Sequence, residues 1–292
     1  RAITEEIMKE STAEQAPIAA KAYAAMVPGV DLKPWDFERR AVGPNDVQFD
    51  ITYCGVCHSD LHQIRNDWFE GIFPMGPGHT VGENVSKFKP GDLAAIGCLV
   101  DSCRECENCR NGLEQYCLRR SSGTYNSLEQ DGVTPTYGGY SNTIVADQDF
   151  VLKLSDSIDM AAAAPLLCAG ITTYSPLRRW NVGKGHKLGV VGLGGLGHMA
   201  VKFGVAFGAE VTVLSTSTRK EEDARRLGAV NFVVTTDADQ VAAAKGSLDF
   251  ILDTVSAEHD LNLYLSLLKT DGVHICVGVP SEPYKVAPFS VI

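Results

Sequence analysis

The alternation of apolar and polar residues changes along the chain and divides it into two regions. Strict alternation over Val47–Tyr53 predicts a half-buried β-strand, and Tyr140–Ala146 predicts a second short strand among frequent Gly and Pro residues. From about Ala161 onward, apolar strand-like runs alternate with helical stretches instead. The strands predicted there are Lys187–Val191, Val211–Ser215, Phe232–Thr236, Phe250–Val255 and Val273–Val279, and the helices include Lys220–Leu227 and Leu261–Leu268.

Strands that alternate with helices form a parallel sheet that is covered on both faces. The sequence therefore predicts a β-rich first domain over residues 20–160 and an α/β second domain over residues 161–292, with the boundary near 155–165. Residues 1–19 are interpreted as a leader or an extension, in which the first ten have the apolar spacing of a short helix, and no function is assigned to them.

The composition is ordinary for a globular protein and excludes several classes of function. Apolar residues make up 45% and charged residues 21% of the 292 residues, far from the composition of a disordered chain. The net charge of −10, from 26 basic and 36 acidic residues, argues against a nucleic-acid partner. The longest nearly apolar run, Met160–Ile171, is shorter than the roughly 20 residues that cross a bilayer, so no membrane partner is expected.

Four of the nine cysteines have the spacing of metal ligands, C-x2-C-x2-C-x7-C. Four thiolates in one loop can close a tetrahedron around zinc with no open position, which is a structural site. The alternatives are an accidental grouping and an iron–sulfur cluster, in whose motif the fourth cysteine follows sooner and precedes proline. Metal-binding thiols, and the lack of an apolar secretory segment at Arg1–Glu10, predict a cytoplasmic, reduced protein. The four residues are Cys103, Cys106, Cys109 and Cys117.

A glycine-rich turn follows the predicted strand Lys187–Val191 and opens a helix. In such a turn the first glycine permits the sharp bend, the second admits a pyrophosphate close to the backbone, and the third packs helix on strand. A purely structural turn is the alternative, but the strand before it and the helix after it favour a dinucleotide site. The turn consists of Gly192, Leu193, Gly194, Gly195, Leu196 and Gly197.

The end of the next strand indicates which dinucleotide is bound. NAD-binding units usually place an acidic residue there, on the ribose 2′-hydroxyl, whereas the first acid here is Glu221. Hydroxyl and basic side chains at this point suit a 2′-phosphate and favour NADP over NAD. A solvated helix start with Ser or Thr caps is the alternative. The residues concerned are Ser215, Thr216, Ser217, Thr218, Arg219 and Lys220.

Several motifs together resemble one enzyme family. Cys54–His62 (CGVCHSDLH), the four-cysteine run, Ala164–Leu177 (APLLCAGITTYSPL) and the glycine turn are similar, in this order, to zinc-dependent medium-chain alcohol dehydrogenases. Residues 20–292 most resemble the cinnamyl alcohol dehydrogenase branch and its bacterial broad-range aldehyde reductases. The resemblance implies a GroES-like catalytic domain joined to a Rossmann domain, with the active site between them and with two zinc ions and NADP(H) as cofactors.

The resemblance also implies a catalytic metal centre, whose ligands lie too far apart in the sequence for their spacing to group them. By position it implies that Cys57, His79 and Cys168 hold a catalytic zinc with one place left open for water or substrate oxygen. Cys54 is implied to be structural, and Asp60 is implied to orient a metal ligand.

Proton transfer and cofactor contacts are implied in the same way. Ser59 and His62 resemble the family's proton relay, and a histidine suits its last step because imidazole titrates near neutral pH. The relay passes the ribose of the cofactor, so Ser59 is also a cofactor contact. Thr172 matches a position at the nicotinamide end, and Thr254 and Gly278 match further cofactor contacts.

The chain departs from the family pattern at three places. The family has Glu and a strand after the zinc histidine, whereas Thr80 and Val81 follow His79 directly here. Loss of a strand would leave buried backbone groups unpaired and displace the ligand, so we expect residues to be absent between His79 and Val81. The family also continues beyond Ile292, where further residues are expected. Ser121–Gly123 replaces an aromatic residue of lignin-making members, which predicts a less dedicated aromatic pocket.

The leading hypothesis is an NADP(H)-dependent zinc alcohol dehydrogenase that acts mainly as an aldehyde reductase on a small molecule, as a homodimer. Zinc would serve as Lewis acid, and hydride would pass between the substrate carbon and nicotinamide. One alternative is a polyol dehydrogenase of the same superfamily, although Ser215–Lys220 counts against its usual NAD. Another is a catalytically inactive NADP-binding protein, which the short segment after His79 suggests.

Overall fold

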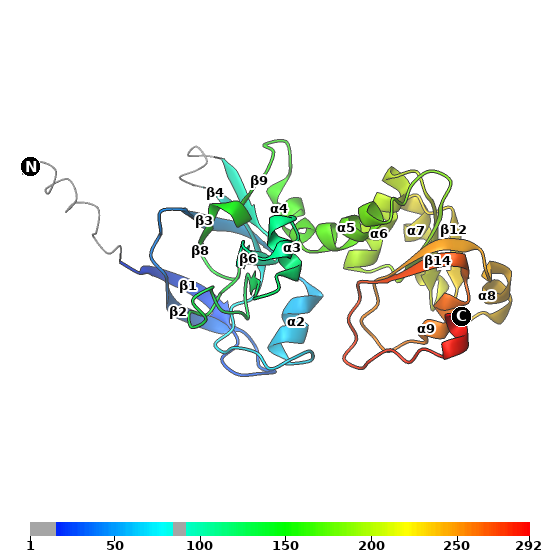
Figure 1. The fold of residues 1–292 in the computed structure, drawn as a ribbon, viewed down its shortest axis with the longest axis horizontal. Coiled ribbons are helices and arrows are strands. Elements are labelled where there is room, and N and C mark those ends of the chain that lie inside the picture. The colour runs from blue at the N-terminus through cyan, green and yellow to red at the C-terminus, as the bar shows by residue number, and fades with distance from the viewer. Residues whose placement is uncertain (1–15, 84–91) are drawn as a thin grey trace, which may run out of the picture. The chain divides into compact units, whose positions relative to one another are not determined.

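The fold of the protein comes from a computed structural model, which describes residues 16–83 and 92–292. The chain forms two compact units, and the division between them falls between Leu167 and Cys168 (Figure 1). The helix expected in the first ten residues lies outside the described residues. Each unit has its own sheets and its own buried clusters.

The first unit is built on antiparallel sheets. Its strands are β1 Ile18–Ala24, β2 Lys33–Arg39, β3 Asp46–Gly55, β4 His79–Glu83, β5 Leu93–Ile96, β6 Leu99–Asp101, β7 Ser122–Gly123, β8 Thr143–Asp147 and β9 Leu152–Lys153. Five of them pair in the order β8-β3-β4-β5-β9, beside the two-stranded sheets β1-β2 and β6-β7. In β3, Val47 and Phe49 are buried while Gln48 and Asp50 are exposed, which confirms the first part of the predicted alternation. The alternation ends at a bulge between Ile51 and Tyr53, after which Tyr53 is exposed.

The second predicted strand begins later than expected. β8 covers Thr143–Asp147, not Tyr140–Ala146, because the backbone just before it is paired elsewhere. The N–H groups of residues 138–140 donate to the carbonyl groups of residues 76–78. This contact fixes the loop before β8 against the segment that leads into His79.

The strand after His79 that was expected to be lost is present in the structure, whereas the absence of residues between His79 and Val81 stays a prediction. β4 runs without interruption from His79 to Glu83 and pairs with β3 on one side, through one bulge, and with β5 on the other. The residues directly after His79 therefore form the strand that was expected to be lost, and the hydrogen-bonded ladder on both sides is kept.

The second unit is a parallel sheet with both faces covered, which confirms the predicted fold class. Its strands are β10 Lys187–Val191, β11 Glu210–Ser215, β12 Asn231–Val234, β13 Leu248–Asp253 and β14 Leu268–Cys276, in the order β12-β11-β10-β13-β14. Val190 and Val191 are neighbours on β10 but belong to different buried clusters, one on each face. Ala200 of α6 (Gly195–Ala206) packs in the first cluster and Tyr264 of α9 (Leu261–Leu265) in the second.

The remaining helices are short. They are α2 His58–Ile64, α3 Glu107–Arg110, α4 Met160–Ala163, α5 Ala169–Arg179, α7 Glu221–Arg226 and α8 Ala238–Ala244. Over the described residues no single helix has the length and hydropathy of a membrane span; the pair Met160–Leu167 and Ala169–Arg179, bent by 57°, passes only when taken together. The predicted helix Leu261–Leu268 stops at Leu265, because Leu268 already pairs in β14.

Candidate active site

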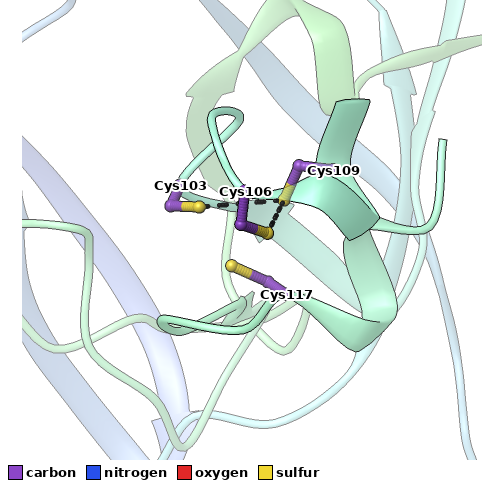
Figure 2. A group of neighbouring side chains, drawn as sticks. All are labelled: Cys103, Cys106, Cys109 and Cys117. Carbon is purple, nitrogen blue, oxygen red and sulfur yellow. Dashed lines mark hydrogen bonds between the residues drawn. The ribbon is translucent and has the colours of Figure 1, made fainter. Parts of the chain in front are cut away.

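Four cysteine side chains converge in one loop of the first unit (Figure 2). Their sulfur atoms all lie within 4.8 Å of one another, and Cys109 Sγ is 3.4 Å from Cys106 Sγ and 3.9 Å from Cys103 Sγ. Cys106 directly precedes α3, and Cys117 directly follows the 3₁₀ helix η1 (Glu114–Tyr116). Two tight helical turns thus bring sulfur atoms from both ends of the loop to one point.

The backbone of this loop favours the thiolate forms of two of the cysteines, Cys106 and Cys117. The N–H of Leu118 donates to Cys106 Sγ at 3.4 Å, and the N–H groups of Cys109 and Leu118 lower the pKa of the Cys106 thiol. Backbone N–H groups, that of Cys103 foremost, lower the pKa of Cys117 to about 6. A cluster of thiolates needs a cation, and four sulfur ligands suit zinc in a closed site with no position for substrate.

Cys57, His79 and Cys168 form a second group, and their ligand atoms lie within 4.8 Å of one another. Cys57 is the residue before α2, His79 opens β4, and Cys168 directly follows Leu167, whose side chain is buried with Ala95. His79 is buried, and its Nδ1 lies 3.3 Å from the carbonyl oxygen of Gly97.

The state of the His79 ring fits a metal ligand. A carbonyl oxygen can only accept, so Nδ1 carries the proton and Nε2 carries a lone pair. Nε2 is buried and has no hydrogen-bond partner, which is costly unless a cation is bound there. Two thiols and one imidazole would hold a zinc ion with one position left over, which is the ligand number of catalytic zinc sites.

Gly78 shapes the approach to His79. Its φ of 104° lies in the region that favours glycine, and a Cβ there would collide with Cys54 Sγ and with the ring of Tyr140. Burial raises the pKa of Cys54 to about 12, and the charge of Asp60 adds to the effect. Cys54 therefore favours the thiol form and packs beside the group of Cys57, His79 and Cys168.

Asp60 is buried and makes contacts that the sequence did not indicate. Its Oδ2 accepts from the backbone N–H of Cys57 at 2.9 Å and from the hydroxyl of Tyr140 at 3.1 Å, and its Oδ1 accepts from the hydroxyl of Tyr125 at 2.7 Å. These contacts fix the backbone of Cys57 rather than the ring of His79, which bonds to Gly97 instead. The two tyrosines follow the four-cysteine loop in sequence, and only the fold brings them to Asp60.

Ser59 and His62 lie on α2, one turn apart. Ser59 Oγ is 3.5 Å from Cys57 Sγ, next to the three-residue group. His62 Nδ1 is 2.8 Å from Asp67 Oδ2, its ring stacks on Trp68, and its Nε2 is buried without a hydrogen-bond partner. Sequence reasoning missed Asp67, although it lies five residues after His62, because no motif marks it.

The glycine turn has the geometry of a phosphate-binding loop. Gly192 has a φ of 82°, and a Cβ on Gly197 would collide with the carbonyl group of Gly192, so helix and strand pack closely here. A Cβ at Gly194 or Gly195 would meet nothing within 4 Å, so the start of α6 is open on this side. Leu193 is buried and supports the turn from beneath.

The segment after β11 brings a basic side chain to this turn. Lys220 Nζ donates to the carbonyl oxygen of Leu193 at 2.8 Å, while Arg219 is exposed. The alternative of a serine or threonine helix cap gains no support, because neither Ser217 before η4 (Thr218–Lys220) nor Lys220 before α7 makes a side-chain cap bond. Ser215 ends β11, and Thr216 and Thr218 are exposed.

Two of the remaining predicted cofactor contacts lie beside the glycine turn. Thr254 Oγ1 donates to the carbonyl oxygen of Val191 at 2.7 Å, directly before Gly192. Gly278 packs against the backbone of Val255, where a Cβ would collide. Thr172 lies on α5, where its N–H donates to the carbonyl oxygen of Cys168.

Comparison with known proteins places this geometry in a family. The alcohol dehydrogenase GroES-like domain matches residues 43–156, and the zinc-binding dehydrogenase family matches residues 195–292. An NADP-dependent alcohol dehydrogenase C of Mycolicibacterium smegmatis is 52% identical over 279 residues, which cover 93% of this chain and 80% of the relative. An aldehyde reductase of Escherichia coli is 50% identical over 275 residues, which cover 91% and 78% respectively.

A solved structure agrees with these matches. The cinnamyl alcohol dehydrogenase of Sorghum bicolor superposes with a TM-score of 0.90 at 45% identity, covering 94% of this chain and 80% of that one. The chain therefore belongs to the zinc-binding medium-chain alcohol dehydrogenases, in the branch that is similar to the cinnamyl alcohol dehydrogenases.

Proposed function

We propose that the protein is an NADP(H)-dependent zinc alcohol dehydrogenase that acts mainly as a reductase of a broad range of aldehydes, aromatic ones included. The observation that carries the proposal is the group of Cys57, His79 and Cys168, in which the buried Nε2 of His79 has no hydrogen-bond partner. Relatives that are 52% and 50% identical are named as an NADP-dependent alcohol dehydrogenase and an aldehyde reductase. Their names support reversible alcohol oxidation and aldehyde reduction as the reaction class.

Each cofactor contributes one part of the chemistry. Bound at the three-residue group, zinc polarises a carbonyl oxygen and lowers the pKa of an alcohol, while the nicotinamide supplies or accepts hydride. The task of Cys57, His79 and Cys168 is to hold the metal with one position open to the substrate. The carbonyl of Gly97 keeps the His79 proton on Nδ1, so that Nε2 always presents its lone pair.

The chain's own residues move the proton. Ser59 Oγ, beside Cys57 Sγ, hydrogen-bonds the substrate oxygen and exchanges its proton with it. Asp67 accepts a hydrogen bond from Nδ1–H of His62. Nε2 is therefore the ring atom of His62 that takes or gives a proton. When Nε2 is protonated, the imidazolium is paired with the Asp67 carboxylate at 2.8 Å, which stabilises it.

The preference for NADP(H) is assigned to the end of β11. Lys220 is held at the glycine turn by its bond to Leu193, and no acidic side chain follows β11 before Glu221. A 2′-phosphate would meet donors and positive charge there, whereas an acid would repel it. Ser215–Arg219 complete the proposed contact surface.

Steady-state kinetics and metal analysis test the proposal. NADPH oxidation is measured with aliphatic and aromatic aldehydes, and zinc is counted in the same preparation. Two zinc ions per chain and turnover far faster with NADPH than with NADH are expected. One zinc and no turnover would support the alternative of an inactive NADP-binding protein. NAD-dependent oxidation of polyols would support the alternative of a polyol dehydrogenase. The inactive alternative was suggested by the short segment after His79, but β4 keeps this residue beside Cys57 and Cys168.

Assembly and location complete the proposal. We propose a homodimer, tested by analytical ultracentrifugation, and a cytoplasmic location, tested by cell fractionation. None of the nine cysteines forms a disulfide, which supports a reducing compartment.

A further inference from the structure

A cluster of ionisable side chains at the ends of β13 and β14 has no part in the mechanism above. Asp253, the last residue of β13, has no exposed surface. Its Oδ2 is 2.7 Å from Nε2 of His259 and 3.7 Å from Nε2 of His274, which lies on β14. A buried carboxylate is costly unless donors surround it, so the hydrogen bonds of the two imidazoles decide its state.

The hydrogen bonds identify His259 as the charged ring. Its Nε2 faces the carboxylate of Asp253, and its Nδ1 lies 2.8 Å from the carbonyl oxygen of Ala257. Both partners are acceptors, so both ring nitrogens must donate, and a ring with two N–H groups is an imidazolium. Asp253 and His259 therefore form a buried ion pair.

The other titratable groups that face the pair are neutral. Burial lowers the pKa of His274, with Asp253 opposing and His259 adding to the effect, which favours the neutral form of this ring. Burial also raises the pKa of the side chains of Tyr264, Cys276 and Tyr284. The exposed neighbours in the chain, Glu258 and Asp260, pair with Lys285 and with the backbone N–H of Asn262.

Asp253 joins the two loops that leave the sheet here, because its carboxylate holds the first loop and its backbone carbonyl holds the second. The N–H of Val255 donates to Asp253 Oδ1 at 3.0 Å, and the N–H groups of Val277 and Gly278 donate to the Asp253 carbonyl oxygen at 2.9 Å. Between these bonds lies Thr254, whose hydroxyl is bonded to Val191 before the glycine turn. The carboxyl edge of a parallel sheet, beside this turn, is where dinucleotides bind.

We propose that the Asp253–His259 ion pair positions the loops of Thr254 and Gly278 for NADP(H), so that protonation of His259 is linked to cofactor affinity. The inference rests on the proposed function. Asp253 and His259 are positioning residues, since they act through Thr254 and Gly278. When pH rises and His259 loses its proton, one ring nitrogen is left facing an acceptor with no hydrogen between them. The hydrogen-bonded ion pair that positions the loops is then lost, and the affinity for NADPH falls.

The test is a titration of the zinc-loaded protein with NADPH, followed by nicotinamide fluorescence between pH 6 and pH 9. His259→Gln keeps a neutral donor at every pH, and it is expected to raise the Kd for NADPH about fivefold at pH 6, roughly 1 kcal/mol. The difference between wild type and His259→Gln should shrink toward pH 9. Taking this difference cancels the titration of the cofactor's own 2′-phosphate, which is common to both proteins.

A matched control is His186→Gln. This residue directly precedes β10, at the amino end of the same sheet, and its ring accepts a hydrogen bond from the N–H of Gly183. This variant is expected to leave the Kd and its pH dependence unchanged. Equal Kd values for wild type and His259→Gln at every pH would overturn the inference while leaving the proposed function intact. Failure of the wild type to bind NADPH at all would instead overturn the proposed function.

A measurement on the wild type avoids any folding defect of a variant. In protein labelled with ¹⁵N-histidine, the ring of His259 should show two protonated nitrogens at pH 6.5, while the ring of His274 shows one. A neutral His259 ring at that pH would overturn the ion pair and with it the inference, whatever the variant does.

Discussion

Replacing Tyr125 by phenylalanine removes one hydroxyl group from the contacts that hold Cys57, a proposed metal ligand. The hydroxyl donates to Oδ1 of Asp60 at 2.7 Å, and both side chains are buried, Asp60 at 2% exposure and Tyr125 at 6%. Because water has little access, the carboxylate oxygen would lose its donor without replacement. The loss would be passed on to Cys57, whose N–H is bonded to the other oxygen of Asp60.

The expected magnitude follows from the charge and the burial. Hydrogen bonds to a charged group are worth roughly 1.5–3 kcal/mol, so Tyr125→Phe should lower the free energy of unfolding of the first unit by about 2 kcal/mol. Tyr140→Phe should cost less, about 1 kcal/mol, because its bond to Asp60 is longer at 3.1 Å and its side chain is only half-buried. In Tyr125→Phe, loss of the hydrogen bond to Asp60 should also speed the release of zinc from Cys57, His79 and Cys168 about tenfold.

Urea unfolding followed by tryptophan fluorescence measures the first effect, since Trp35 and Trp68 lie in the first unit. A colorimetric chelator measures zinc release, with Tyr23→Phe as control because that side chain is 58% exposed. Two results would refute the reasoning. One is a Tyr125→Phe variant with wild-type stability and zinc release, and the other is a Tyr140→Phe variant that is the more damaged of the two.

The remaining predictions concern the metals, the cofactor and the relay. Cys168→Ala should lower the zinc content from two to one and abolish turnover at unchanged Tm, whereas Cys106→Ala should lower Tm by roughly 5 °C or more, because a closed zinc site contributes folding energy; metal analysis and calorimetry would contradict this if the two variants behaved alike. Lys220→Ala should raise the KM for NADPH about tenfold and leave that for NADH unchanged; an equal change for both cofactors would remove Lys220 from the 2′-phosphate site. Asp67→Asn should lower kcat about tenfold with little change in the KM for NADPH, because His62 loses the charge that stabilises its imidazolium; an unaltered kcat would exclude Asp67 from the relay.

The sequence by itself determined the features that depend on neighbours along the chain. Four cysteines within one short loop can reach a single point whatever the rest of the protein does, and α3 and η1 bring them there. The glycine turn is equally local, because strand, turn and helix are consecutive and Gly192 needs its positive φ for the bend alone. Alternation over Val47–Asp50 likewise predicts which side chains are buried, since the backbone fixes the period of a regular strand up to the bulge after Ile51.

Only the tertiary structure decided the contacts between distant segments. Cys57, His79 and Cys168 come from a helix start, a strand start and the residue after Leu167, and no spacing rule links them. The same holds for Asp60, whose tyrosine partners come from the loops after the cysteine site. The strand after His79 shows most clearly what could not be predicted from the sequence alone. Its sequence looked too short to pair, yet backbone hydrogen bonds depend little on side-chain identity, so the next residues in the chain fill the ladder between β3 and β5.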